Sequence, residues 1–277
     1  AEDLFKNADT AMHEAKKSGR NTLRFFDPEM QAKLEARSEL EIGLREAWRN
    51  QEFRLYYQMQ VNYDGRVLGA EVLLRWFHPE RGLISPLQFI PLAEETGLIL
   101  PIGQWVLETA CAQLKTWEQD ASTRRDLVLA VNVSAKQFRQ ADFVAQVQAV
   151  VRQHVINPAK LKLELTESML QENIEDTIAK MNDLKAMGVQ FSLDDFGTGY
   201  SSLTYLKRLP LDQVKIDQSF VRNLTTDKAD EVMVMAIVDL GMNFEVDVIA
   251  EGVETEAQLE LLHRHDCFCF QGYLFSK

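Results

Sequence analysis

The sequence predicts an α/β fold, a (β/α)8 TIM-type barrel preceded by a helix and a short N-terminal segment. Two observations support this prediction. Eight apolar, strand-like runs alternate with helical patterns. The runs occupy residues 53–275 of the 277-residue chain, close to the ~250 residues of a typical closed barrel. A doubly wound open sheet is the alternative, but it would place a glycine-rich phosphate turn after the first strand, and "YYQMQVNYDG" carries no such turn.

The first element, residues 1–27, has one helical stripe of Leu and Ala residues, which Gly19 closes, and then the strand-like run "NTLRFF". Such a short segment cannot bury a core alone, so we expect it to be the end of a preceding domain. Asp27 and Pro28 follow as an N-cap and first-turn pair. They predict a linker helix over residues 28–50 that leads into the barrel.

The barrel strands are expected where apolar residues cluster or alternate with polar ones. The runs cover residues 53–61, 67–76, 127–134, 161–168, 189–195, 213–217, 246–252 and 267–275. Helical patterns lie between most of them. In "SPLQFIPLAEETG", for example, Ser85 is a cap and Pro86 a first helical residue.

Charge and composition limit the function. The net charge of −12 and the pI near 5.0 argue against a nucleic acid polymer as partner, because phosphate binding needs a basic face. No apolar run reaches the ~18 residues of a membrane span, so we expect no membrane contact by this fragment. Without a visible signal peptide we expect a cytoplasmic location, with any membrane anchor of the parent protein outside these residues. The three cysteines lack zinc-site spacing.

Polar side chains lie in or at the end of nearly every predicted strand after the first. In a barrel these ends converge on one face, where active sites are found. Crowded carboxylates repel unless positive charge lies between them, and oxygen ligands without Cys or His favour Mg²⁺ or Mn²⁺. More carboxylates than one ion needs predict two ions. The residues are Glu71, Asn132, Glu164, Asp194, Asp195, Lys215, Glu251 and Gln271.

Asp194 and Asp195 are adjacent, so on a regular strand they face opposite sides. If the strand ends there, the backbone can turn and direct both toward metal. Gly197 and Gly199 give the following loop conformations that other residues avoid. Taken alone, an Asp-Asp pair before such a loop is more often turn chemistry. The joint placement of the polar residues favours the metal interpretation.

Arg75 shares strand parity with Glu71, so it could reach the same rim and bind a phosphate through two hydrogen bonds. A surface salt bridge is the alternative for this residue. Both interpretations stay open from the residues alone.

Seven motifs then identify a family: "GAEVLLRW", "NVS", "ELTES", "DDFGTGYSSL", "KID", "AEGVE" and "QGYLFS". In order and spacing they resemble the EAL family of cyclic di-GMP phosphodiesterases, and we expect this domain over residues 38–277. Residues 1–27 resemble the C-terminal end of a GGDEF (diguanylate cyclase) domain. The resemblance implies a bacterial GGDEF–EAL parent protein and a barrel whose first strand is antiparallel to the others.

The resemblance also implies roles for individual residues. Glu71, Asn132, Glu164 and Asp194 would hold one metal, and Asp194, Asp195 and Glu251 the second. Lys215, with Glu71 and Asp194, would form the catalytic centre, Lys215 positioning or deprotonating the attacking water. Cyclic di-GMP would be linearised to 5′-pGpG. Further expected roles are substrate binding by Arg75, Gln58 and Gln271, and support of the site by Glu167, Glu254, Gly197 and Gly199.

The sequence departs from the family pattern at two positions, with Val72 in the name motif and Met59 where proline is usual. Neither change removes an expected ligand. Because the ligands come from fixed strands, Ca²⁺ is expected to bind but inhibit. A homodimer through the barrel is expected. A catalytically silent cyclic di-GMP receptor and a purely structural interaction domain remain the alternative functions.

Overall fold

The computed structural model describes residues 26–120, 126–167, 169, 173–197 and 206–276, with residues 12 and 16. Two compact units are distinguished within it. The N-terminal unit comprises the described residues up to Phe53 and the segment Trp76–Glu95. The barrel unit comprises Arg54–Arg75 and the described residues from Thr96 onward. The expected GGDEF remnant lies almost entirely outside the described residues.

The N-terminal unit contains helix α2 (Pro28–Arg49), strand β3 (Gly82–Ile84) and helix α3 (Pro86–Thr96). The helix expected over residues 28–50 is thus confirmed, and the Asp27 side chain caps it by accepting from the Glu29 amide. Its core is aromatic: the Trp76 ring packs edge-on against Phe89 at 5.7 Å between ring centroids.

The barrel strands form a closed ring. Their order is β1-β9-β8-β7-β6-β5-β4-β2, and β1 also pairs with β2. All neighbours from β2 round to β9 are parallel, and β1 is antiparallel to β9. The predicted barrel with an antiparallel first strand is therefore confirmed. The strands are β1 (Phe53–Asn62), β2 (Val67–His78), β4 (Val128–Asn132), β5 (Leu161–Thr166), β6 (Gln190–Phe196), β7 (Gln213–Ile216), β8 (Asp247–Ala250) and β9 (Cys269–Gln271).

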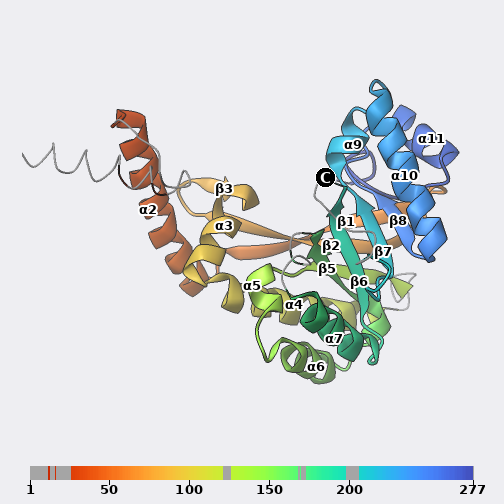
Figure 1. Ribbon diagram of the computed structural model, residues 1–277. Helices are drawn as coiled ribbons and strands as arrows, with labels where there is room; N and C mark the ends of the chain where they lie inside the picture. The colour runs from red at the N-terminus through yellow and green to blue at the C-terminus, as the bar shows by residue number, and fades with distance from the viewer. Residues whose placement is uncertain are drawn as a thin grey trace, which may run out of the picture. The chain divides into compact units, whose positions relative to one another are not determined.

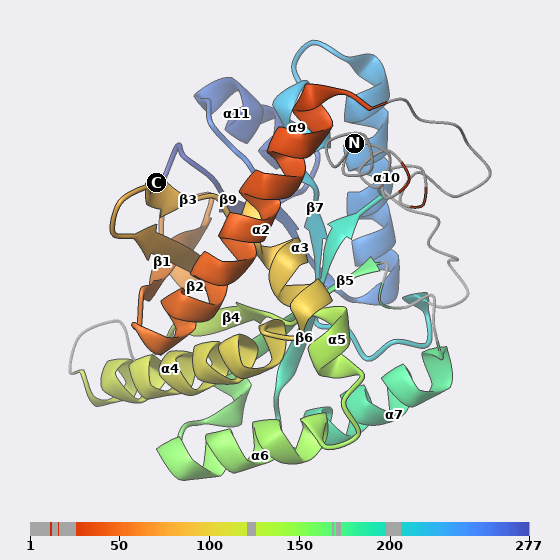
Figure 2. The ribbon, with the colours of Figure 1, turned by 90° about the vertical axis from the view of Figure 1, so that its left-hand side faces the viewer.

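Helices cover the outside of the barrel. Helix α10 packs on β7 and β8, α7 on β6, and α4 on β4 (Figure 1). Figure 2 shows α4, α6 and α7 next to one another along the outer side of the strands, with the short α5 beside α4. Among the described helices, none has both the length and the apolar character required to cross a membrane. The helices are α4 (Ile99–Gln119), α5 (Ala135–Phe138), α6 (Phe143–His154), the short 3₁₀ helix η2 (Pro158–Lys160), α7 (Ile174–Lys185), α9 (Gln218–Arg222), α10 (Lys228–Phe244) and α11 (Glu256–Arg264).

Two strand boundaries differ from the prediction in ways that affect the site. Strand β2 continues two residues past the predicted end at Trp76, to His78, and pairs there with β3, which the sequence did not suggest. Glu71 lies within the strand, as it does in the predicted run. Strand β6 does not end at Asp195 but runs to Phe196, with a register shift against β7 after Leu193. This irregularity is a β-bulge, which re-aims side chains without ending the strand.

Candidate active site

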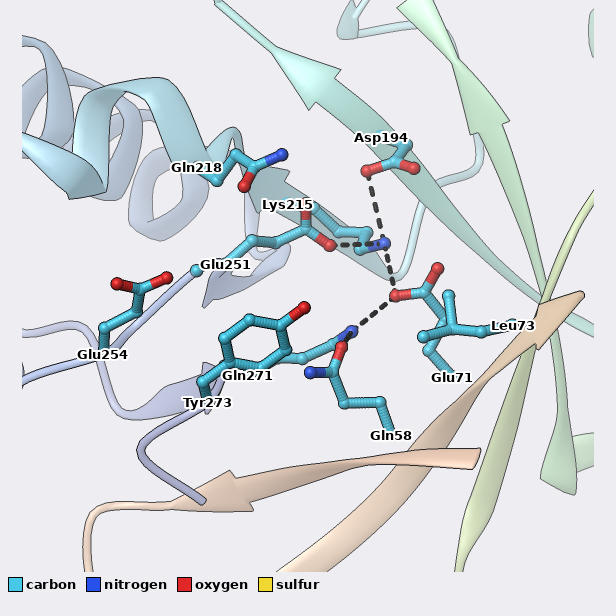
Figure 3. Close-up of a pocket in the computed structure, with 12 residues that line it drawn as sticks. Gln58, Glu71, Leu73, Asp194, Lys215, Gln218, Glu251, Glu254, Gln271 and Tyr273 are labelled. Atoms are coloured by element: carbon cyan, nitrogen blue, oxygen red, sulfur yellow. Dashed lines mark hydrogen bonds and ion pairs between the residues drawn. The ribbon is translucent and has the colours of Figure 1, made fainter. Parts of the chain in front are cut away.

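A buried lysine lies among four carboxylates inside the barrel. Lys215 on β7 has only 1% of its side chain exposed, and its ammonium group is within ion-pair distance of all four. Figure 3 draws three of them, Glu71, Asp194 and Glu251. The distances from Lys215 Nζ are 2.6 Å to Glu251 Oε1, 2.9 Å to Glu164 Oε2, 3.1 Å to Glu71 Oε2 and 3.2 Å to Asp194 Oδ1. We call these five residues the lysine–carboxylate cluster.

The parallel strands explain why residues so far apart in the chain meet. Asn132 is opposite Glu164 in the pairing of β4 with β5, and Asp194 is opposite Thr166 in the pairing of β5 with β6. These positions lie at the carboxyl ends of their strands, where barrels carry their active sites. The structure thus brings together all but one of the predicted metal-binding side chains around Lys215.

Hydrogen bonds fix the orientation of Glu71. Its Oε1 accepts from Asn132 Nδ2 at 2.6 Å, and its Oε2 accepts from Gln271 Nε2 at 2.6 Å. Gln271 also donates to Gln58 Oε1 at 2.9 Å and accepts from Gln60 at 3.0 Å. The two predicted substrate-binding glutamines are therefore part of the network that positions Glu71 (Figure 3).

The carboxylates of the cluster have unequal proton affinities. Burial raises the pKa of Glu164 well above its usual value, and the charge of Glu71 adds to the effect. Burial also raises the pKa of Glu251, to about 8, against the opposing charge of Lys215. The pKa of Glu71 is lowered, because Lys215, Gln271 and Asn132 together outweigh its burial.

Burial and nearby carboxylate charge act against each other on the pKa of Lys215. Burial alone would lower its pKa, but the charges of Glu164 and Glu251 outweigh burial and raise the pKa well above its ordinary value. One ammonium group among four carboxylates leaves the cluster negatively charged when all the groups are ionised.

The cluster is suited to hard divalent cations. Glu164 Oε1 is buried, and no described residue donates a hydrogen bond to it. An excess of carboxylate oxygens, one of them without a donor, is the chemistry that Mg²⁺ and Mn²⁺ prefer. Within the described ranges, however, no three His, Cys, Asp or Glu side chains are grouped as a ready-made metal cage. The Lys215 ammonium lies where the carboxylates converge, so it holds them in this arrangement.

Asp195 lies at the bulge rather than in the cluster. It has a left-handed backbone with φ of 55°, and its amide donates to Asp194 Oδ1 at 3.0 Å. Its pKa is raised to about 6 by partial burial, by the charge of Asp194 and by Asp217, with which it shares a hydrogen bond. The bulge therefore directs Asp195 toward Asp217, a residue that the sequence analysis did not single out.

Gly197 follows the bulge and needs to be glycine for two reasons. Its φ of 94° is left-handed, and a Cβ there would lie 3.1 Å from a ring carbon of Phe220. Gly199, the other predicted loop glycine, lies outside the described residues.

Of the remaining predicted site residues with described positions, one lines the cavity beside the cluster and two do not. Glu254 lines the cavity beside the cluster, and Glu167 is buried one residue after β5. Arg75 does not line that cavity: its guanidinium group lies 5.8 Å from the centre of the Tyr56 ring and donates to the Leu74 carbonyl at 3.1 Å.

The cavity above the cluster has a volume of about 250 Å³. Gln218 and Tyr273 also line it, and the sequence analysis missed both (Figure 3). Each lies two residues after the last residue of a barrel strand, β7 and β9 respectively. That position was the available signal, because the loops after the strands form the active-site face of a barrel.

Known proteins resemble this chain over most of its length. The EAL domain family matches residues 43–277. The chain is 45% identical over 276 residues to the bifunctional diguanylate cyclase/cyclic di-GMP phosphodiesterase MucR of Pseudomonas aeruginosa, covering 99% of this chain and 40% of MucR. It is 40% identical over 277 residues to the cyclic di-GMP phosphodiesterase NbdA of the same organism, covering 100% of this chain and 35% of NbdA.

A solved structure of the PaMucR phosphodiesterase in complex with c-di-GMP has a TM-score of 0.83 and 46% identity, covering 86% of this chain and 96% of that one. The chain spans 40% or less of the length of MucR and NbdA. The family match includes the whole barrel unit and every residue of the lysine–carboxylate cluster. This chain therefore belongs to the EAL domain family.

Proposed function

We propose that this chain hydrolyses cyclic di-GMP to linear 5′-pGpG in a metal-dependent reaction. The observation that carries the proposal is the convergence of four carboxylates on Lys215 at the active-site face of the barrel. Relatives named as cyclic di-GMP phosphodiesterases, and the c-di-GMP complex of a similar structure, support the choice of substrate.

Mg²⁺ or Mn²⁺ is the proposed cofactor, with two ions per site. Glu71, Asn132, Glu164 and Asp194 would hold one ion, and Asp194, Asp195 and Glu251 the other. Bound there, the ions would neutralise phosphate charge and lower the pKa of a water molecule. The buried Glu164 oxygen without a donor and the excess of negative charge support this assignment.

The residues of the chain orient the reactants. The attacking water is held by Lys215 and the adjacent carboxylates, in line with the phosphorus–O3′ bond of the substrate. The water oxygen forms a new bond to phosphorus as the bond to O3′ breaks. The water gives up a proton to a carboxylate of the site, and O3′ takes up a proton from solvent, which leaves a 5′-phosphate and a free 3′-hydroxyl. Gln271 and Asn132 keep Glu71 oriented throughout.

Substrate contacts are assigned to residues around the cavity. Gln58 and Gln271 face it, and Tyr273 presents an exposed ring at its edge (Figure 3). Aromatic faces stack on nucleobases, so Tyr273 suits a guanine. Arg75 can approach a phosphate only by leaving its position over the Tyr56 ring.

Two outcomes of one experiment separate the enzyme from a silent receptor. The chain is incubated with cyclic di-GMP and Mg²⁺, and the nucleotides are separated by ion-exchange chromatography and identified by mass. The proposal predicts 5′-pGpG, with none formed when EDTA replaces Mg²⁺. Binding of cyclic di-GMP without product in Mg²⁺ or Mn²⁺ would make the chain a receptor.

Three further expectations remain predictions. We expect residues 1–27 to be the end of a GGDEF domain. We also expect this part of the parent protein to lie in the cytoplasm and the barrel to form a homodimer. Sedimentation velocity with and without cyclic di-GMP tests the last of these.

A further inference from the structure

A second surface cavity lies at the opposite end of the barrel from the active site. It is a groove of about 400 Å³ where β8 and β9 begin, between the end of α10 and the loop after α11. We call it the basal groove. Its volume is within the ~300–1,000 Å³ of known ligand clefts. It takes no part in the proposed reaction, because none of its lining residues lines the active-site cavity.

The walls of the basal groove are apolar and accessible. Met242 is 56% exposed at the end of α10, and Phe268 is 50% exposed before β9. Val246 and Val248 form part of the wall between them and are only partly covered. Large apolar side chains exposed around one groove are typical of interaction sites, whereas single ones are not.

The rim of the groove is acidic. Glu245, Asp247 and Asp266 line it and are exposed. Among the described residues, no lysine, arginine or histidine lies within ion-pair distance of Glu245 or Asp266. Both lie at the carboxyl ends of helices, where the helix dipole already places partial negative charge.

Local stability would favour other residues at both helix ends. Glu245 has a φ of 56° and Asp266 a φ of 60°, the left-handed region in which glycine is preferred after a helix. A cation would also interact better with the dipole there. Strained positions of this kind are concentrated at functional sites. Here both add negative charge to the same apolar groove.

We propose that the basal groove docks a basic, amphipathic segment of a partner protein. Apolar side chains of the segment would enter between Met242 and Phe268, and its lysine or arginine side chains would pair with Glu245 and Asp266. We choose a basic partner because its positive charge would complement the acidic rim of the groove. The same carboxylates would repel nucleic acids and anionic membrane surfaces.

The test uses a fluorescent peptide of Lys, Leu and Ala residues with an apolar face, and a second peptide in which Glu replaces every Lys. Binding to the chain is followed by anisotropy and by NMR of the methionine methyl groups. Met242 reports on the groove. Met235 is also exposed on α10 but does not line the groove, so it serves as an internal control.

The basic peptide is expected to shift the Met242 methyl signal, to leave Met235 unchanged and to bind less tightly as salt rises. Glu245→Lys should weaken binding roughly tenfold. The matched variant Asp239→Lys makes the same charge change on an exposed part of α10 outside the groove and should have little effect.

Three results would overturn the proposal. Equal binding of the Lys and Glu peptides would exclude charge recognition. Equal weakening by Glu245→Lys and Asp239→Lys would show only general attraction to an acidic protein. A Met242 shift that depends on protein concentration without any peptide would make the groove a contact between copies of this chain.

Discussion

Lys215 Nζ lies 2.9 Å from Glu164 Oε2, while the other oxygen of the same carboxylate is buried without a donor among the described residues. One half of Glu164 is therefore neutralised by the protein and the other half is not. Buried polar atoms without a partner are rare, because each costs about 1–3 kcal/mol. A bound cation would satisfy this atom.

Replacing Glu164 by Gln should remove a metal ligand while preserving the shape of the side chain. We expect Mn²⁺ affinity to fall on the order of tenfold or more, because a neutral amide is a weaker ligand for a hard cation. Electron paramagnetic resonance of free Mn²⁺ measures this without any turnover. Glu260→Gln, on an exposed part of α11, is the matched control. Unchanged Mn²⁺ affinity in Glu164→Gln would exclude this residue as a ligand.

The metal-free protein should lose stability as pH rises. Burial raises the pKa of Glu251 from its ordinary value near 4.5 to about 8. Between these values the folded state holds a proton that the unfolded state releases, so the free energy of unfolding decreases as pH increases. The loss should be on the order of a few kcal/mol.

Urea unfolding in EDTA at several pH values between about 5 and 8.5 measures this effect. Glu251→Gln has no proton to release there, so its pH dependence should be smaller than that of the wild type. Parallel pH profiles for the two proteins would contradict the prediction.

Val155 is expected to be a site where substitution stabilises the fold. It ends α6 with a φ of 50°, is 69% exposed, and is β-branched, which makes the left-handed conformation costly. Val155→Gly should raise the free energy of unfolding by roughly 0.5–1 kcal/mol, since glycine is favoured at this position after a helix. Val155→Ala removes the same side chain without relieving the backbone. A glycine variant no more stable than the alanine variant would refute this explanation.

Calcium should bind the site but inhibit the reaction. Mg²⁺ needs near-octahedral oxygens at ~2.0–2.1 Å, whereas Ca²⁺ takes six to eight ligands at ~2.3–2.6 Å. The carboxylates come from several strands of one closed barrel, so the backbone limits how far they can adapt. Misplacement by about 1 Å can reduce a rate on the order of a hundredfold. The turnover rate at fixed Mg²⁺ and rising Ca²⁺ measures this inhibition. Full activity in saturating Ca²⁺ alone would contradict this geometric explanation.

Much of the barrel could be predicted because the sequence patterns of its strands and helices are local. Strand and helix patterns alternate along the chain, and side-chain parity directs Glu71, Glu164 and Lys215 to the inside of the barrel. Parallel strands then bring their carboxyl ends together, so sequence order was enough to place these three residues on one face. The residue types at these strand ends also predicted a site rich in oxygen ligands.

The unpredicted features depend on contacts between distant strands. The bulge at Asp195 exists because β6 shifts its register against β7, which no local pattern reveals. The extension of β2 to His78 depends on β3, a strand of only three residues. The sequence placed Lys215 on this face, but its ion pairs with all four carboxylates depend on three other strands and a loop. Lysine by itself is most often a surface residue.

The central claim is that the lysine–carboxylate cluster hydrolyses cyclic di-GMP. The most direct measurement compares kcat of the wild type in Mg²⁺ with that of Lys215→Ala, with Lys33→Ala on the exposed surface of α2 as control. We expect 5′-pGpG from the wild type and the control, and a kcat for Lys215→Ala lower by the ~10²–10⁴ typical of a group that assists proton transfer. No product from the wild type, or a Lys215→Ala variant that retains most of its kcat, would contradict the account.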